Sequence, residues 1–136
     1  MARSAYEGSP CGVVLCIDDN VEVLECVKAF LESFGYTVLT ALSGGKALEL
    51  ASIHAVDVVI VDYFMPEMDG GAVAVAMRRI RPQAPIIMLS GEPDIPEHVL
   101  NGVDAFVAKD RLASHLLPTI AQLHGSGSTP ALSYDA

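Results

Sequence analysis

Five polar side chains of the sequence follow short apolar runs. The runs are residues 13–17, 58–61, 86–89 and 105–108, and the polar side chains after them are Asp18, Asp19, Asp62, Ser90 and Lys109. Runs of this length without polar alternation are typical of strands in a parallel sheet, which are buried on both faces. The carboxyl ends of parallel strands meet at one edge of the sheet, so we expect these side chains to converge there.

Three carboxylates and a lysine at one edge indicate the chemistry of phosphoryl transfer. Carboxylates brought close together repel one another unless a cation compensates. Lys109 supplies one positive charge, and a divalent metal would supply the rest. Ligands that are all oxygen favour Mg²⁺, since no Cys or His is placed to select zinc. Beside Mg²⁺, Lys109 and the hydroxyl of Ser90, an aspartate can act as the nucleophile and carry a phosphoryl group as a labile acyl phosphate.

Hydrophobic periodicity predicts the elements that hold these side chains in place. The expected strands are residues 13–17, 36–41, 56–61, 86–89 and 105–108, and the expected helices are residues 21–34, 46–53, 72–80, 93–102 and 111–124. Asn20 is a candidate cap for the first helix, and Gly35 is its expected left-handed end. Pro118 should kink or break the last helix. Strands that alternate with helices predict an α/β fold, a doubly wound five-stranded parallel sheet with five helices.

Length and composition limit the classes of protein. The 136 residues predict one domain at 11–124, between a flexible N-terminus at 1–10 and a flexible C-terminal tail at 125–136. A net charge of −9 argues against direct binding to nucleic acid. The apolar runs are too short to span a membrane, and the first residues lack the features of a signal peptide. With three cysteines and no C-x-x-C pair, we expect a reduced, cytoplasmic protein.

Four blocks of sequence occur in order around the same polar residues. They are I-D-D-N at 17–20, D-Y-F-M-P-E-M-D-G at 62–70, L-S-G at 89–91 and G-V-D-A-F-V-A-K at 102–109. With these blocks the chain resembles the receiver domain of two-component response regulators over about residues 12–124. The resemblance implies a flavodoxin-like sheet with strand order 2-1-3-4-5. It also implies a stand-alone receiver, or a receiver cut from a longer chain, that takes part in a phosphorelay.

The resemblance implies how the acidic residues act. Asp62 is the phosphoacceptor. Asp19 binds Mg²⁺ directly, and Asp18 helps through the water shell of the metal. Asp62 and the backbone carbonyl of Phe64 complete the protein ligands. A domain of this kind catalyses only its own phosphorylation and dephosphorylation, so we do not expect an enzyme that acts on other substrates.

The resemblance also implies a switch and its partners. Ser90 and Lys109 each bond an oxygen of the phosphoryl group. Ser90 and Phe106 form the switch pair, in which the hydroxyl moves toward the phosphate and the ring turns inward behind it. The phosphoryl group comes from a histidine kinase or a histidine phosphotransfer protein. The output is a protein effector that docks on the face made by the fourth helix, the fifth strand and the fifth helix.

One position departs from the family pattern, and two others influence how long the acyl phosphate persists. Asp110 stands where the family usually has a proline, held in a cis bond after the lysine. A cis bond before a residue other than proline is disfavoured by about 2.5–4 kcal/mol, so we expect a trans bond and a reshaped loop. Phe64 and Glu92 occupy positions that influence the lifetime of the acyl phosphate in the family. Because Phe64 cannot orient an attacking water, we expect slow autodephosphorylation.

Two other functions fit part of the sequence. One is a Mg²⁺-dependent phosphatase with an aspartate nucleophile, of the haloacid dehalogenase type. Such enzymes have the pattern D-x-D-x-T after the first strand, whereas here Asp62 is followed by Tyr63 and Phe64, and no substrate cap is present. The other is a receiver-like protein-interaction module without phosphorylation, which only Asp110 supports. Taken alone, Asp18 and Asp19 would also suit the cap and first turn of a helix.

Overall fold

Five parallel strands form one sheet in the computed structural model, which describes residues 12–92 and 94–124. The strands are β2 (Val13–Ile17), β3 (Thr37–Ala41), β4 (Val58–Val61), β5 (Ile86–Ser90) and β6 (Ala105–Ala108). Their spatial order is β3-β2-β4-β5-β6, which is the order 2-1-3-4-5 in chain numbering. The predicted doubly wound, flavodoxin-like fold is therefore confirmed. The termini predicted to be flexible, 1–10 and 125–136, lie outside the described residues.

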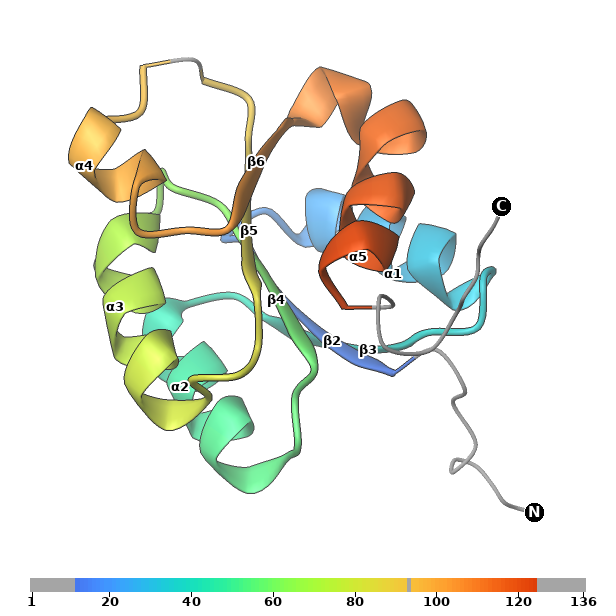
Figure 1. Cartoon of the computed structure of the whole chain (residues 1–136), viewed down its shortest axis with the longest axis horizontal. Coiled ribbons are helices and arrows are strands. Elements are labelled where there is room, and N and C mark those ends of the chain that lie inside the picture. Colours follow the sequence, from blue (N-terminus) through green and yellow to red (C-terminus); the bar gives the residue numbers. More distant parts are fainter. Residues whose placement is uncertain (1–11, 93, 125–136) are drawn as a thin grey trace.

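Helices cover both faces of the sheet (Figure 1). They are α1 (Val21–Glu32), α2 (Gly44–Ile53), α3 (Gly70–Ile80), α4 (Glu97–Leu100) and α5 (Leu117–Leu123). The helices α2, α3 and α4 lie on one face, and α1 and α5 lie on the other. None of the helices in the described ranges is long and apolar enough to cross a membrane.

The strand β4 shows why an unbroken apolar run gives a central strand. All four of its side chains are buried. Val59 and Val61 pack in the core under α2 and α3, whereas Val58 and Ile60 pack in the core under α1 and α5. Because successive side chains of a strand point to opposite faces, only a run that is apolar at every position can fill both cores.

Side-chain caps set the starts of the long helices. The side chains of Asn20, Ser43 and Asp69 accept hydrogen bonds from backbone N–H groups in the first turns of α1, α2 and α3. As a result α2 and α3 each begin two residues earlier than predicted. Gly35 has the expected positive φ of 98°. The helix α1 nevertheless ends at Glu32, before the predicted end at residue 34.

The segment after β5 and the last helix differ most from the regular α-helices that the sequence predicts. Of the predicted helix 93–102 the structure describes residues 94–102, and one helical turn, α4, forms there. The region of the predicted last helix consists of a 3₁₀ turn η1 (Lys109–Arg111), a π-helical turn η2 (Leu112–Leu116) and α5, which follow one another directly. Pro118 has no N–H to donate, and its ring crowds the carbonyl of Ser114 one turn earlier. The backbone stays helical from Leu112 through Leu123, so Pro118 does not break the helix into two pieces, and the chain accommodates it with a widened, π-helical turn.

Candidate functional site

Three carboxylates meet at the carboxyl edge of the sheet. Asp18 and Asp19 follow β2, and Asp62 follows β4, its neighbour in the sheet. One carboxylate oxygen from each residue lies within 4.8 Å of the others. Asp18 and Asp62 are buried, with 2% and 6% of their surface exposed, whereas Asp19 is exposed. The structure therefore brings together the acidic residues that the sequence predicts to converge, and it leaves one of them open to solvent.

Lys109 joins this cluster from the 3₁₀ turn after β6. Its Nζ lies 2.8 Å from Oδ2 of Asp18 and 3.6 Å from Oδ2 of Asp62. The other oxygen of Asp18, Oδ1, accepts a hydrogen bond of 2.9 Å from the N–H of Asn20. Both oxygens of Asp18 therefore have partners, so this carboxylate is held in one orientation, and Lys109 bridges it to Asp62.

The loop between β4 and α3 places Asp62 through a close backbone approach at Gly70. The N–H of Gly70 donates to the carbonyl of Tyr63 at 2.8 Å. A Cβ at position 70 would lie 2.3 Å from the backbone oxygen of Asp62 and 2.7 Å from the Cα of Tyr63. Only glycine allows this approach. The backbone N–H of Phe64 in the same loop favours the ionised Asp62 carboxylate and lowers its pKa.

The electrostatic environment raises the pKa values of Asp62 and Lys109. Burial and the nearby charge of Asp18 raise the pKa of Asp62, and Asp19 adds to this effect, although Lys109 and the Phe64 N–H oppose it. Burial alone would lower the pKa of Lys109, but its hydrogen bonds and charge interactions with Asp18 and Asp62 raise it above its ordinary value. Ionising Asp62 is thus unfavourable in the metal-free site, and keeping Lys109 charged is favourable.

We predict a pH-dependent gain in stability for Asp62→Asn in metal-free protein. The pKa of Asp62 is raised on folding, so its stabilising contribution is complete below its ordinary pKa of 3.8 and is lost as the pH rises through the raised value. Relative to wild type, Asp62→Asn should therefore gain free energy of unfolding as the pH rises from about 4 toward neutrality. Urea unfolding in EDTA across this pH range measures the difference.

The matched control for this measurement is Asp94→Asn, at an exposed aspartate before α4. It should show no such pH-dependent gain. An Asp62→Asn difference that stays flat with pH would contradict the prediction.

The family of the chain follows from comparison with known proteins. Residues 14–121 match the family model of the response regulator receiver domain. The chain belongs to this family. The family that the four sequence blocks predict, the receiver domain of response regulators, is therefore confirmed.

Curated relatives of this receiver domain are longer proteins. It is 31% identical to the transcriptional regulatory protein PrrA of Mycobacterium tuberculosis over 120 residues, which are 85% of this chain and 52% of PrrA. It is 35% identical to the transcriptional regulatory protein GlrR of Escherichia coli over 99 residues, which are 71% of this chain and 22% of GlrR. The chain thus spans about half of one relative and less than a quarter of the other.

Solved structures of receiver domains have the same fold. The chemotaxis protein CheY4 of Vibrio cholerae matches with a TM-score of 0.76 and 31% identity, over 82% of this chain and 98% of that chain. The response regulator TrrA of Thermotoga maritima, solved in complex with Mg²⁺ and BeF, matches with a TM-score of 0.78 and 28% identity, over 82% of this chain and 98% of that chain.

Ser90 and Phe106 of this receiver domain lie on either side of a hollow. Ser90 ends β5 and is buried, and its hydroxyl accepts a hydrogen bond of 3.2 Å from the N–H of Glu92. The ring of Phe106 on β6 is 40% exposed. Between them lies a hollow of about 430 Å³, which Lys109 and Asp110 also line. The ring therefore does not occupy the inward position that the resemblance implies for the switched state.

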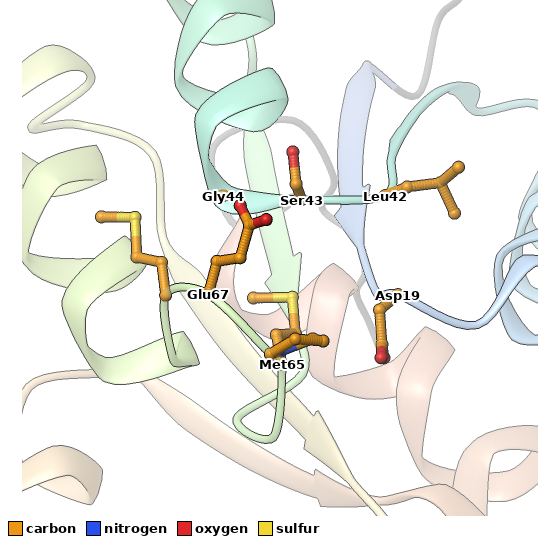
Figure 2. Close-up of a pocket in the computed structure, with 8 residues that line it drawn as sticks. Asp19, Leu42, Ser43, Gly44, Met65 and Glu67 are labelled. Carbon is orange, nitrogen blue, oxygen red and sulfur yellow. The ribbon is translucent and has the colours of Figure 1, made fainter.

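A second hollow beside Asp19 was not expected from the sequence. It has a volume of about 140 Å³, and the residues that line it are Asp19, Leu42, Ser43, Gly44, Met65, Pro66, Glu67 and Met68. Figure 2 shows these residues, which come from the loops after β2, β3 and β4 and from the start of α2. Leu42 is 51% exposed although it is large and apolar. Leu42 directly follows β3 and therefore lies at the same sheet edge as Asp19. This position in the sequence is the signal that could have predicted its place beside the acidic cluster.

The predicted departures from the family pattern are visible in the backbone and on the surface. The peptide bond between Lys109 and Asp110 is trans, as expected, and the two residues begin the 3₁₀ turn η1. Asp110 is exposed. Phe64 is also exposed, and its ring stacks edge-on against Tyr63 with the centroids 4.8 Å apart. A bulky, exposed side chain therefore stands two residues after Asp62.

Proposed function

We propose that this receiver domain accepts a phosphoryl group on Asp62 from a phosphohistidine of a kinase or a phosphotransfer protein, and then signals through a protein partner. One observation carries the proposal: Asp62 lies within reach of two further carboxylates and of the ammonium of Lys109 at the carboxyl edge of the sheet. The structure of TrrA with Mg²⁺ and BeF, a chain of the same fold, supports this assignment.

The residues at the site fit Mg²⁺. The carboxylate oxygens of Asp18, Asp19 and Asp62 lie within 4.8 Å of one another, and a set of donors that are all oxygen is what Mg²⁺ prefers. Three carboxylates against the one ammonium of Lys109 leave an excess of negative charge for a divalent ion to balance. Asp19, the exposed carboxylate, and the backbone carbonyl of Phe64 would hold the ion. When bound, Mg²⁺ supplies positive charge that neutralises the oxygens of the phosphoryl group.

The side chains of the site have distinct parts in the transfer. A carboxylate oxygen of Asp62 forms the new bond to phosphorus, the bond from phosphorus to the donor histidine breaks, and its electron pair returns to the histidine nitrogen. Lys109, 3.6 Å from Asp62, is placed to pair with a phosphoryl oxygen. Asp18 holds Lys109 at 2.8 Å and so orients it.

The output rests on Ser90 and Phe106. To bond a phosphoryl oxygen, the Ser90 hydroxyl would leave the N–H of Glu92 and turn toward Asp62. The hollow of about 430 Å³ behind Ser90 gives the ring of Phe106 room to turn inward. This movement would change the surface made by α4, β6 and α5, where a protein effector docks. The phosphoryl group thus biases an element with two packing states.

Phosphorylation by a small donor tests this function. Incubation with acetyl phosphate and Mg²⁺ should add one phosphoryl group to the wild-type chain, detected as intact mass, and none to Asp62→Asn. The matched control is Asp69→Asn in the same loop, because asparagine also caps a helix and should preserve the start of α3. It should be phosphorylated like wild type.

Each alternative function would give a different result. An adduct on Asp62→Asn equal to that on the wild type would contradict the assignment of Asp62 as the phosphoacceptor. A wild type with no adduct would favour a receiver-like module without phosphorylation. Steady turnover of many small phosphate esters would favour a phosphatase.

A further inference from the structure

The hollow beside Asp19 opens at the same sheet edge as the acidic cluster. Its volume is about 140 Å³. A cavity of about 150 Å³ holds one molecule of the size of benzene, so this hollow has room for a single side chain. In Figure 2 the loop of Met65 and Glu67 faces the loops of Asp19 and Leu42 across the hollow. Since the carboxylates of Asp19 and Asp62 lie within 4.8 Å of each other, a group seated there adjoins the phosphoacceptor site.

Most of the wall of this hollow is apolar. Met65 and Met68 are partly buried and pack against the core under α2 and α3, whereas Leu42 is 51% exposed. A Cβ on Gly44 would lie 2.8 Å from Sδ of Met68, so the start of α2 packs directly against this methionine. Leu42 and the two methionines thus offer apolar surface from two loops, and methionine adapts to groups of different shape.

The charged groups of the hollow are acidic and lack a cation. Its lining contains no lysine or arginine. Within residues 12–92 and 94–124, the side chains of Asp19 and Glu67 make no ion pair or hydrogen bond. Other acids of this edge have partners, since Asp18 pairs with Lys109 and Asp69 caps α3. Mg²⁺ at the proposed metal site would balance Asp19, and Glu67 would still lack a countercharge.

We propose that this hollow seats an arginine of the protein that carries the phosphohistidine, with its stem against Leu42 and the methionines and its guanidinium on Glu67. The proposal rests on the proposed function, because the phosphodonor is the partner that must reach Asp62, which the hollow adjoins. Arginine combines an apolar stem that packs on apolar surface with a planar cation that binds a carboxylate through parallel hydrogen bonds. An uncharged side chain would leave Glu67 without a countercharge, and an acidic one would be repelled.

The probe n-butylguanidinium, which carries the stem and the cation of arginine, tests the hollow without a phosphoryl donor. We would titrate the chain, with ¹³C-labelled methionine methyl groups, in Mg²⁺ at low and constant ionic strength. The methyl signals of Met65 and Met68 should shift, whereas those of the fully buried Met77 and Met88 should not. The probe should bind at least about threefold more tightly than guanidinium, which lacks the stem, or n-butanol, which lacks the charge.

Two variants and a matched control locate the binding. Glu67→Gln should weaken binding of n-butylguanidinium by about threefold and leave that of n-butanol unchanged, whereas Leu42→Ala should weaken both. The control is Glu92→Gln, at an exposed acid that lines the separate hollow at Ser90, and it should bind like wild type.

Unshifted signals of Met65 and Met68, or equal weakening by Glu67→Gln and Glu92→Gln, would overturn the proposal. Because no phosphoryl group is transferred in the titration, this failure is separate from a failure of Asp62 to be phosphorylated. A chain that binds the probe but gains no phosphoryl group would overturn the phosphodonor as the partner.

Discussion

Gly70→Ala should lower the free energy of unfolding by about 3 kcal/mol, because the added Cβ would lie 2.3 Å from the backbone oxygen of Asp62. The next atom that it meets is the Cα of Tyr63 at 2.7 Å. Both contacts are with backbone, so no side-chain rotation relieves them and the loop after β4 must move. Asp62 moves with that loop, and the fraction of chain phosphorylated by acetyl phosphate should fall as well. Urea unfolding and intact mass measure the two effects.

Gly45→Ala is the matched control for this substitution. A Cβ at Gly45 meets no atom within 4 Å, and the residue lies in the first turn of α2. Alanine is the better helix former, so this variant should be more stable than wild type by about 0.5 kcal/mol. Equal stability of Gly70→Ala and wild type would show that the loop after β4 does not depend on this close approach.

Lys109→Met should destabilise the metal-free protein by about 2 kcal/mol at neutral pH, because two buried carboxylates lose the cation between them. Lys109 lies 2.8 Å from Asp18 and 3.6 Å from Asp62, whose side chains are almost entirely buried. Combining Lys109→Met with Asp62→Asn should recover part of the lost stability, since one of the two carboxylates left without a cation is then absent. Urea unfolding in EDTA of the two single variants and the double variant measures the coupling.

Lys46→Met provides the comparison for Lys109→Met. Its ion pair with Glu49 is exposed and 3.9 Å long, so its loss should change stability by less than about 0.5 kcal/mol. If Lys109→Met and Lys46→Met changed stability equally, or if Asp62→Asn recovered nothing, the bridging role of Lys109 would be wrong.

The sequence predicts the sheet and the site because both depend on local pattern. Runs apolar at every position, such as 58–61, can be buried only between two layers of helices, and this decides the class of fold. Polar residues directly after such runs must then lie at one edge of the sheet. Helix starts were predicted less well: α2 begins at Gly44 and α3 at Gly70, because the caps Ser43 and Asp69 act on residues that looked like loop.

Contacts between distant segments decide the rest, and local pattern does not encode them. The need for glycine at position 70 follows from the distance between two backbone segments, which no side-chain type reveals. Lys109 was predicted to meet the acidic cluster, but only the structure shows that it sits closer to Asp18 than to Asp62. Likewise, the exposure of Phe106 and the hollow that it lines with Ser90 and Lys109 depend on how segments far apart in the sequence come together.

The sequence by itself determined a parallel α/β receiver domain with Asp62 at its acidic edge, because burial on two faces and the residues at strand ends are properties of contiguous segments. The strand order 2-1-3-4-5 that the resemblance implies already places β3 at an edge, and the tertiary structure alone decided what covers that edge. The ammonium that donates to the Val38 carbonyl of β3 comes from Lys28 in another element, and no local pattern of β3 reveals it. The physical reason is that apolar pattern reports burial of side chains, whereas the partners of backbone groups depend on which segments become neighbours in space.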